Sequence, residues 1–167
     1  SEHGRVAEMI GPNHARTTAP AGTGSSETPP FYPIAQQNPA IRPYKDACSA
    51  EWRRAEIASS NGHGNARAMA MIYGHLTAGT SNQLLSDNAL AAATYEVVSE
   101  GPDLVQGQGL RRSKAGFILN TRQNYGPGLN TFGHAGAGGS TGFADPDKQL
   151  GVGYAMNQME NDSAQPS

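Results

Sequence analysis

A single histidine stands among five glycines in residues 132–145, and this segment carries the most chemistry in the chain. Glycines inside strands mark bulges or places where a ligand or another backbone comes close. A strand edge without side chains can direct backbone N–H groups at a substrate oxygen, which is how an oxyanion hole is built. His134 beside it could place a positive charge or move a proton near neutral pH. The alternative interpretation is a glycine-rich hairpin with a surface histidine.

The remaining glycines and histidines match no complete nucleotide, metal or hydrolase motif. The sequence contains no GxGxxG, P-loop or HExxH pattern. One GxSxG match centres on Ser140, but a nucleophile elbow needs a helix directly after the serine. Pro146 and its neighbours predict a turn there, so we expect Ser140 in a hairpin. We therefore predict neither a metal site nor a cofactor.

Two helices are predicted to precede this segment. Apolar residues recur every three or four positions over residues 65–78, and Asn65 is a suitable N-cap. A second helix is expected over 87–97, with Ser86 as its N-cap and Val97 facing inward.

The segment 11–45 holds most of the prolines, which argues against a long helix or a central strand there. A stretch of this length is either a mobile surface segment or a long loop that covers a pocket. The aromatic residues Phe31, Tyr32 and Tyr44 favour the loop, because disordered linkers hold few aromatic residues.

After residue 107 the apolar pattern changes to short strand-like runs joined by turns. Alternation over 150–157 is typical of a strand. Consecutive strands with short turns predict an antiparallel meander, and helices followed by such a sheet predict the α+β class. The expected organisation is one partial domain with a proline-rich loop at 11–45, helices at 61–100 and antiparallel strands at 107–160.

Composition excludes two classes of partner. With 12 basic and 14 acidic residues, the net charge of −2 argues against a nucleic-acid surface. No apolar run approaches the ~20 residues of a membrane span. The single cysteine, Cys48, allows no internal disulfide, so a soluble protein of the cytoplasm or the periplasm fits equally well.

Three stretches, at 61–86, 116–128 and 132–157, follow one another in the order seen in a known family. The most specific is Phe132-Gly133-His134-Ala135-Gly136, followed by Gly142-Phe143-Ala144-Asp145-Pro146. In these stretches the chain resembles the C-terminal half of serine hydrolases related to class C β-lactamases, which include penicillin-recognising peptidases and esterases. The resemblance implies a partial β-lactamase/transpeptidase-like fold with about three strands of a larger sheet.

The resemblance also implies roles for single residues. His134-Ala135-Gly136 matches the family's third motif, in a His-x-Gly variant on an edge strand, so His134 would polarise or orient the substrate. The backbone N–H of Ala137 would serve the oxyanion hole. The residues expected to contact substrate are Ala135, Gly136, Gly138, Tyr32 and Tyr44.

The family's other two motifs, Ser-x-x-Lys and Tyr-x-Asn, do not occur in this sequence. The resemblance therefore implies a C-terminal portion of a serine hydrolase that forms an acyl-enzyme on ester, amide or lactam bonds. A missing N-terminal segment or chain would carry the nucleophile, and this chain alone should be inactive. A neutral histidine lacks a fixed charge, which favours an esterase or peptidase. The alternative is a non-catalytic binding or structural module on the same scaffold.

Overall fold

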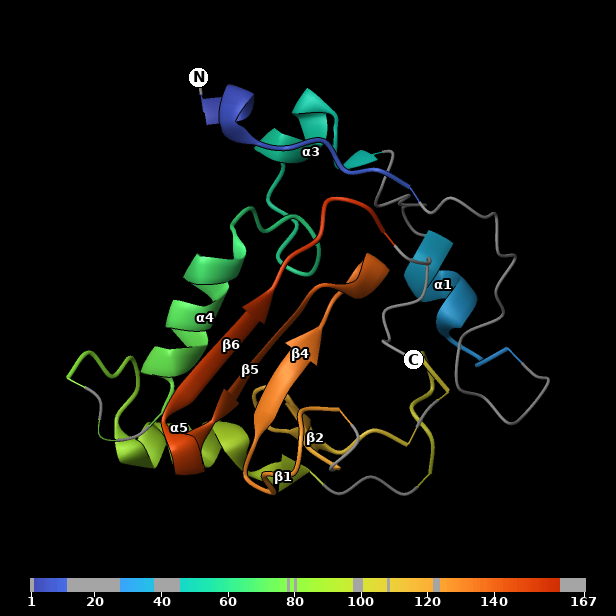
Figure 1. The fold of residues 1–167 in the computed structure, drawn as a ribbon. Helices are drawn as coiled ribbons and strands as arrows, with labels where there is room; N and C mark the ends of the chain where they lie inside the picture. The colour runs from blue at the N-terminus through green and yellow to red at the C-terminus, as the bar shows by residue number, and fades with distance from the viewer. Residues whose placement is uncertain are drawn as a thin grey trace.

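The computed structural model describes residues 2–11, 28–37, 46–77, 79, 81–97, 101–107, 109–121 and 124–159. At its centre is an antiparallel sheet of six strands that follow one another in chain order (Figure 1). The strands are β1 Glu96–Val97, β2 Arg112–Ser113, β3 Ile118–Leu119, β4 Phe132–Ala135, β5 Thr141–Asp145 and β6 Leu150–Tyr154. The α-helices are α1 Tyr32–Gln37, α3 Ala50–Arg54, α4 Ala66–His75 and α5 Asp87–Thr94, and the 3₁₀ helices are η1 Glu2–Arg5, η2 Ala137–Gly139 and η3 Pro146–Lys148. The predicted α+β class with an antiparallel meander is confirmed.

Helices α4 and α5 begin at their predicted N-caps. The Asn65 side chain accepts a hydrogen bond from the Ala68 amide at 2.9 Å. Ser86 caps α5 in the same way, accepting from the Ala89 amide at 3.3 Å. These short polar side chains satisfy amides that have no partner inside the helix, and the sequence therefore marks both starts correctly.

The predicted end of the second helix is wrong. Helix α5 stops at Thr94, and the chain continues as β1, where Glu96 pairs with Ser113 of β2. Val97 is consequently 48% exposed instead of facing inward. Pairing with a distant strand overrides the local helical pattern here.

The sheet has six strands, where the sequence predicts about three of a larger sheet. The three additional strands, β1 to β3, are only two residues long. A tight turn joins β2 to β3, in which the Ser113 amide donates to the Phe117 carbonyl at 2.9 Å and Gly116 takes a φ of +86°. The other three strands, β4 to β6, form the longer part of the meander.

Helix α4 lies directly on the sheet because β5 and β6 present glycines to it. A Cβ atom at Gly153 would lie 2.5 Å from the Ala66 oxygen and 2.7 Å from the Ala70 nitrogen, closer than real Cβ atoms come. A Cβ atom at Gly151 would collide with the backbone of Ala70 and Gly74 in the same way. Small residues on both sides therefore allow helix and strand backbones to touch.

The hydrophobic core fills the space between the helices and this face of the sheet. Its buried members are Leu76, Leu90, Leu119, Phe132 and Ala144. Phe132 of β4 pairs with Leu119 of β3 and Ala144 of β5, and residues paired in this way share one face of a sheet. His134, two residues along β4, therefore lies on the helix-covered face as well.

The N-terminal segment runs beside the segment that follows β6. Ile10 donates to the Asn157 carbonyl at 2.6 Å, and Met159 donates to the Ile10 carbonyl at 2.8 Å. This parallel bridge holds the Met159 side chain in the interior, where it is 2% exposed.

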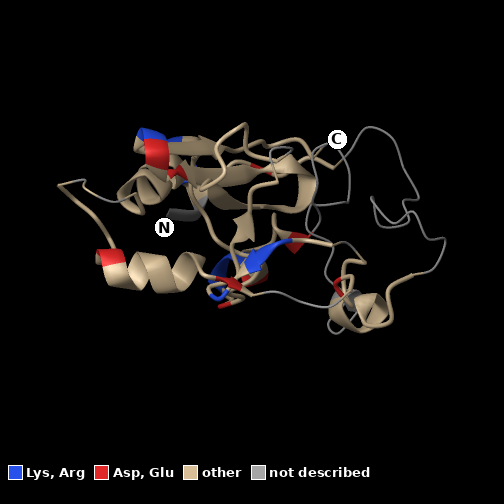
Figure 2. Ribbon diagram, turned by 90° about the horizontal axis from the view of Figure 1, so that it is seen from below, with Lys and Arg blue, Asp and Glu red and all other residues tan. Residues whose placement is uncertain are grey.

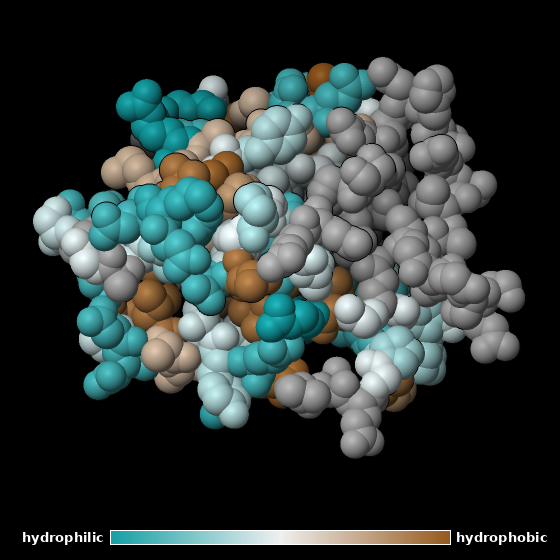
Figure 3. All heavy atoms as spheres, turned by 60° about the horizontal axis from the view of Figure 1, so that its bottom comes forward, coloured by the Kyte–Doolittle hydropathy of each residue, from teal (hydrophilic) through white to brown (hydrophobic). Residues whose placement is uncertain are grey.

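The described surface carries mixed charge and scattered apolar side chains. Figure 2 shows acidic and basic residues in small groups. Arg111 and Glu96 form an ion pair at 2.7 Å. Figure 3 shows hydrophobic side chains in separate patches between hydrophilic ones. None of the helices in the described ranges has the length and apolar character needed to cross a membrane.

Candidate active site

Along β4, His134 is the first residue after those that pair with β3. Strand β3 pairs only with Phe132 and Gly133, whereas β5 pairs with β4 as far as Ala135. In the described part of the chain, the β3 side of the strand is therefore open from His134 onward. The resemblance implies an edge strand for this motif, whereas β4 lies between β3 and β5 and, among the described residues, is open only from His134 onward.

Two backbone amides point to this open side. The Gly136 amide donates to the Ser140 carbonyl at 2.7 Å, so it faces β5. Successive amides of an extended chain point in opposite directions, and those of Ala135 and Ala137 thus face away from β5. Ala137 is exposed, and its amide has no hydrogen-bond partner among the described residues. An exposed backbone amide of this kind is the type of donor from which oxyanion holes are built.

The turn after β4 is built around glycines. Gly138 takes a φ of +84°, which favours glycine, and a Cβ atom there would lie 2.6 Å from Met159 and 2.7 Å from Met156. A Cβ atom at Gly136 would collide with the Ser140 side chain. The side chains of Met156 and Met159 therefore pack against the turn that carries the Ala137 amide.

Ser140 lies in the hairpin connection between β4 and β5, as the sequence predicts. It comes directly after η2, and the chain then enters β5. A nucleophile elbow would instead require a helix at that point.

The His134 ring makes one internal hydrogen bond. Its Nδ1 atom lies 2.6 Å from the Ala135 carbonyl oxygen. A carbonyl oxygen only accepts, so Nδ1 carries the proton and Nε2 is left as an acceptor when the ring is neutral. The exposed ring thus presents Nε2 as a hydrogen-bond acceptor.

Tyr73 of α4 also lies near the His134 strand, and the sequence does not predict this. The sequence pattern places Tyr73 only among the apolar residues of the helix expected over 65–78. Its ring lies where a side chain at Gly142 would be, and Gly142 is the residue paired with His134. Burial raises the pKa of Tyr73, and a hydrogen bond with the His134 backbone partly offsets that rise. The missing side chain at Gly142 therefore makes room for the Tyr73 ring beside the residue that pairs with His134.

Of the two tyrosines expected to contact substrate, only Tyr32 lies among the described residues. Tyr32 begins α1, which is tied to the 101–107 turn by a hydrogen bond from the Phe31 amide to the Leu104 carbonyl at 3.0 Å. No hydrogen bond or ring contact joins Tyr32 to the His134 segment in the part of the chain described. Tyr44 lies outside the described residues, so both roles stay predictions.

Three solved structures are similar to this chain in fold and sequence. A family VIII carboxylesterase is 35% identical, with a TM-score of 0.81 over 99% of this chain and 41% of that chain. A penicillin-binding protein homologue from Caulobacter crescentus is 33% identical, with a TM-score of 0.73 over 99% of this chain and 43% of that one. EstA from Arthrobacter nitroguajacolicus Rue61a is 28% identical, with a TM-score of 0.75 over 98% of this chain and 43% of that one.

The chain thus spans less than half the length of each of these structures. Among proteins with curated descriptions, none matches it significantly. A family profile described as Beta-lactamase matches residues 4–166, which is nearly the whole sequence. The predicted resemblance is confirmed, and the chain belongs to the Beta-lactamase family.

Proposed function

We propose that this chain supplies the strand-edge part of the active site of a serine hydrolase that acts through an acyl-enzyme. The proposal rests on one observation: the exposed Ala137 amide, at the open edge of β4, has no hydrogen-bond partner among the described residues. Negative charge develops on the carbonyl oxygen of an ester, amide or lactam when a serine attacks it. A fixed N–H donor beside that oxygen stabilises the charge without any rearrangement.

The neighbouring residues complete this part of the site. Ala135, Gly136 and Gly138 leave the strand edge and the turn free of bulky side chains, so an acyl group can lie along the backbone. His134, with the proton on Nδ1, offers Nε2 to the substrate or to a proton in transit. Tyr32 and Tyr44 would line the outer part of the pocket.

The serine and its base would come from a segment outside these 167 residues. The sequence lacks Ser-x-x-Lys, and the solved relatives are more than twice as long. Strand β6 offers a place for such a segment, since its outer edge has no strand partner in the described part of the structure. Alone, the chain would bind substrate without forming an acyl-enzyme, because the nucleophile supplies most of the rate enhancement.

Esters are the preferred substrate class within this proposal. The fixed positive charge that would hold a substrate carboxylate is absent, because the motif has histidine in that position. The carboxylesterase and the penicillin-binding protein homologue among the related structures are consistent with acyl transfer from esters or amides.

Labelling with a fluorophosphonate tests the proposal. The purified protein is treated with the probe, and every polypeptide present is weighed by intact mass spectrometry. We expect this chain to remain unlabelled and a segment with Ser-x-x-Lys to carry the adduct. An adduct on Ser140 would contradict the assignment of the nucleophile. A folded, monodisperse sample with no label on any polypeptide would favour the non-catalytic module.

A further inference from the structure

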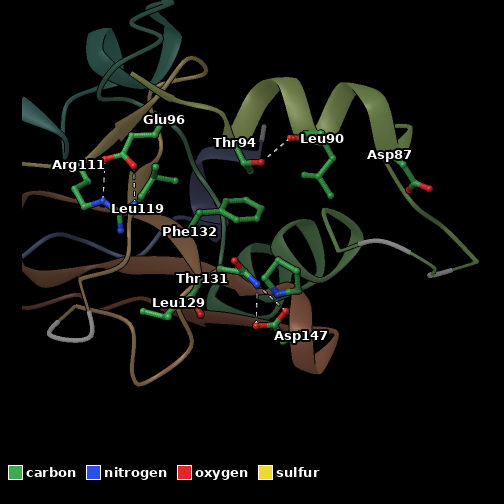
Figure 4. A pocket seen from close by; sticks show the side chains of 13 residues that line it. Asp87, Leu90, Thr94, Glu96, Arg111, Leu119, Leu129, Thr131, Phe132 and Asp147 are labelled. Carbon is green, nitrogen blue, oxygen red and sulfur yellow. Dashed lines mark hydrogen bonds and ion pairs between the residues drawn. The ribbon is translucent and has the colours of Figure 1, made fainter. Parts of the chain in front are cut away.

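The two largest fully buried side chains among the described residues, Phe132 and Met159, lie at opposite ends of β4. Phe132 begins β4 and belongs to the core together with Leu90 and Leu119 (Figure 4). Met159 contacts the turn that follows β4, at Gly138. The core cluster does not include Met159, so the turn after β4 has a support of its own.

Met159 fills the space that a side chain at Gly138 would take. A Cβ atom at Gly138 would lie 2.6 Å from both Cγ and Cε of Met159, and Gly138 itself is buried. Met156 reaches the same point, since its Cε atom would lie 2.7 Å from that Cβ atom. Methionine suits such a position because its unbranched side chain fills irregular gaps.

The direction of the Ala137 amide depends on this turn. Gly136 precedes Ala137 and Gly138 follows it, and glycines leave a backbone many alternative conformations. Two backbone hydrogen bonds join residues of the turn: the Gly136 amide donates to the Ser140 carbonyl at 2.7 Å, and the Gly139 amide donates to the Gly136 carbonyl at 3.2 Å. Neither involves Ala137, so the packing at Gly138 is needed to fix the direction in which its N–H points.

Met159 is itself held in place by the N-terminal segment. Its amide donates to the Ile10 carbonyl at 2.8 Å, and the Ile10 amide donates to the Asn157 carbonyl at 2.6 Å. The groups of a site are held accurately when the residues that support them are locked by packing and hydrogen bonds. Met159 meets both conditions, because its side chain is buried and its backbone is bonded.

We propose that Met159 is a positioning residue for the Ala137 amide. This inference rests on the proposed function, in which that amide donates to the oxyanion. Met159 does not touch the substrate but keeps Gly138, and with it the neighbouring peptide plane, in the orientation that the developing charge requires. Truncation of Met159 leaves a cavity into which the glycine turn can relax, and the donor then moves away from the oxyanion.

Ester hydrolysis by the protein with its serine-bearing segment tests this role. M159A should lower kcat for a p-nitrophenyl ester about 10- to 100-fold, as for a donor displaced by about 1 Å, and change KM less than about twofold. M159L keeps the volume of the side chain and should recover kcat to within about threefold of the wild type. If M159A does not fold, M159V takes its place; valine has no Cε atom, and kcat should fall about threefold or more.

L76A is the matched control for these variants. Leu76 is a buried residue of the core cluster, so its truncation should lower stability as M159A does. It should change kcat less than about twofold at a temperature where the protein stays folded, because it leaves the turn after β4 untouched.

Hydrogen exchange at the Gly136 amide gives a readout that is independent of activity. This amide donates across the turn, so its exchange rate reports how often the turn opens. The rate is expressed relative to that of the Leu119 amide, which lies in the sheet. In M159A this ratio should rise about tenfold, whereas in L76A it should not rise.

A137P, which removes the amide itself, separates this inference from the proposed function. If A137P lowers kcat but M159A lowers it no more than L76A does, the positioning role is wrong and the proposed function stands. An unchanged exchange ratio at Gly136 in M159A would overturn the positioning role as well. If A137P leaves kcat unchanged, the amide has no part in the reaction, and the positioning role fails together with the proposed function.

Discussion

Gly74 of α4 and Gly151 of β6 meet backbone to backbone, but only one of them has room for a side chain. A Cβ atom at Gly74 would lie 3.8 Å from the Gly151 nitrogen, an ordinary contact. A Cβ atom at Gly151 would collide with the Gly74 nitrogen and the Ala70 oxygen. The contact between helix and sheet is therefore asymmetric.

This asymmetry predicts opposite effects of the same substitution. G151A should lower the free energy of unfolding by about 1–3 kcal/mol or more, because backbone atoms have to move apart. G74A should be neutral or stabilise by up to about 1 kcal/mol, because glycine is a poor helix former. Urea unfolding measures both, and G62A, which has open space around it, is the control. Equal losses for G74A and G151A would contradict the packing.

Asn120 is fully buried and organises the turn before β4. Its side chain donates to the carbonyls of Gly126 at 2.7 Å and Gly128 at 2.6 Å, and accepts from the Tyr125 amide at 3.2 Å. N120A should cost about 2 kcal/mol or more, because buried backbone groups lose their partners. Urea unfolding checks this value. N130A removes an exposed amide nearby and should change stability by less than about 0.5 kcal/mol.

The raised pKa of Tyr125 predicts that the folded protein loses stability at alkaline pH. Burial, followed by the proximity of Tyr73, raises the pKa of Tyr125 to about 12. Below pH 10 the tyrosine is neutral in both states, so its contribution to stability is constant. Above that pH the unfolded chain loses the proton first, and stability falls until the pH reaches about 12.

Y125F should reduce this pH dependence. Urea unfolding at pH 9 and pH 11 should show a smaller loss for the variant than for the wild type. Some dependence should remain, since burial also raises the pKa of Tyr73. An unchanged difference between the two pH values would show that Tyr125 ionises normally in the folded protein.

A substitution at Ala137 removes the proposed oxyanion donor with little change of backbone. Proline fits the first position of a helix, and Gly136 has a φ of −116° and a ψ of 162°, which suit the residue before proline. In the protein with its serine-bearing segment, A137P should lower kcat about 10²- to 10³-fold. A137G keeps the amide and should retain most of the activity. Full activity of A137P in an ester hydrolysis assay would remove this amide from the mechanism.

The parts of the fold that depend on local chemistry could be predicted from the sequence. The N-caps Asn65 and Ser86 act within one helical turn, and the alternation over 150–154 is local too. The end of α5 could not be predicted, because β1 forms only through pairing with residues 112–113.

The glycines show where prediction of the site reaches its limit. A missing Cβ atom suits a bound ligand and a packed helix equally well, so spacing alone cannot distinguish the two. Gly142 and Gly153 make room for α4, whereas Gly136 and Gly138 shape the turn at the open edge. Likewise, periodicity places Tyr73 in the core, where its ring lies 6.4 Å from that of Phe117, but does not reveal that the ring also lies beside Gly142, the residue paired with His134.

The bridge between Ile10 and the segment after β6 has a consequence for the order of folding. The bridge joins Ile10 to Gln158, and nearly the whole described chain lies between these two residues. Closing this long loop therefore costs more chain entropy than closing any hairpin of the meander. Met159, which this bridge anchors, packs beneath Gly138. The turn that directs the Ala137 amide should therefore mature late, after the strands have paired. Hydrogen exchange should find it among the first parts of the molecule to open.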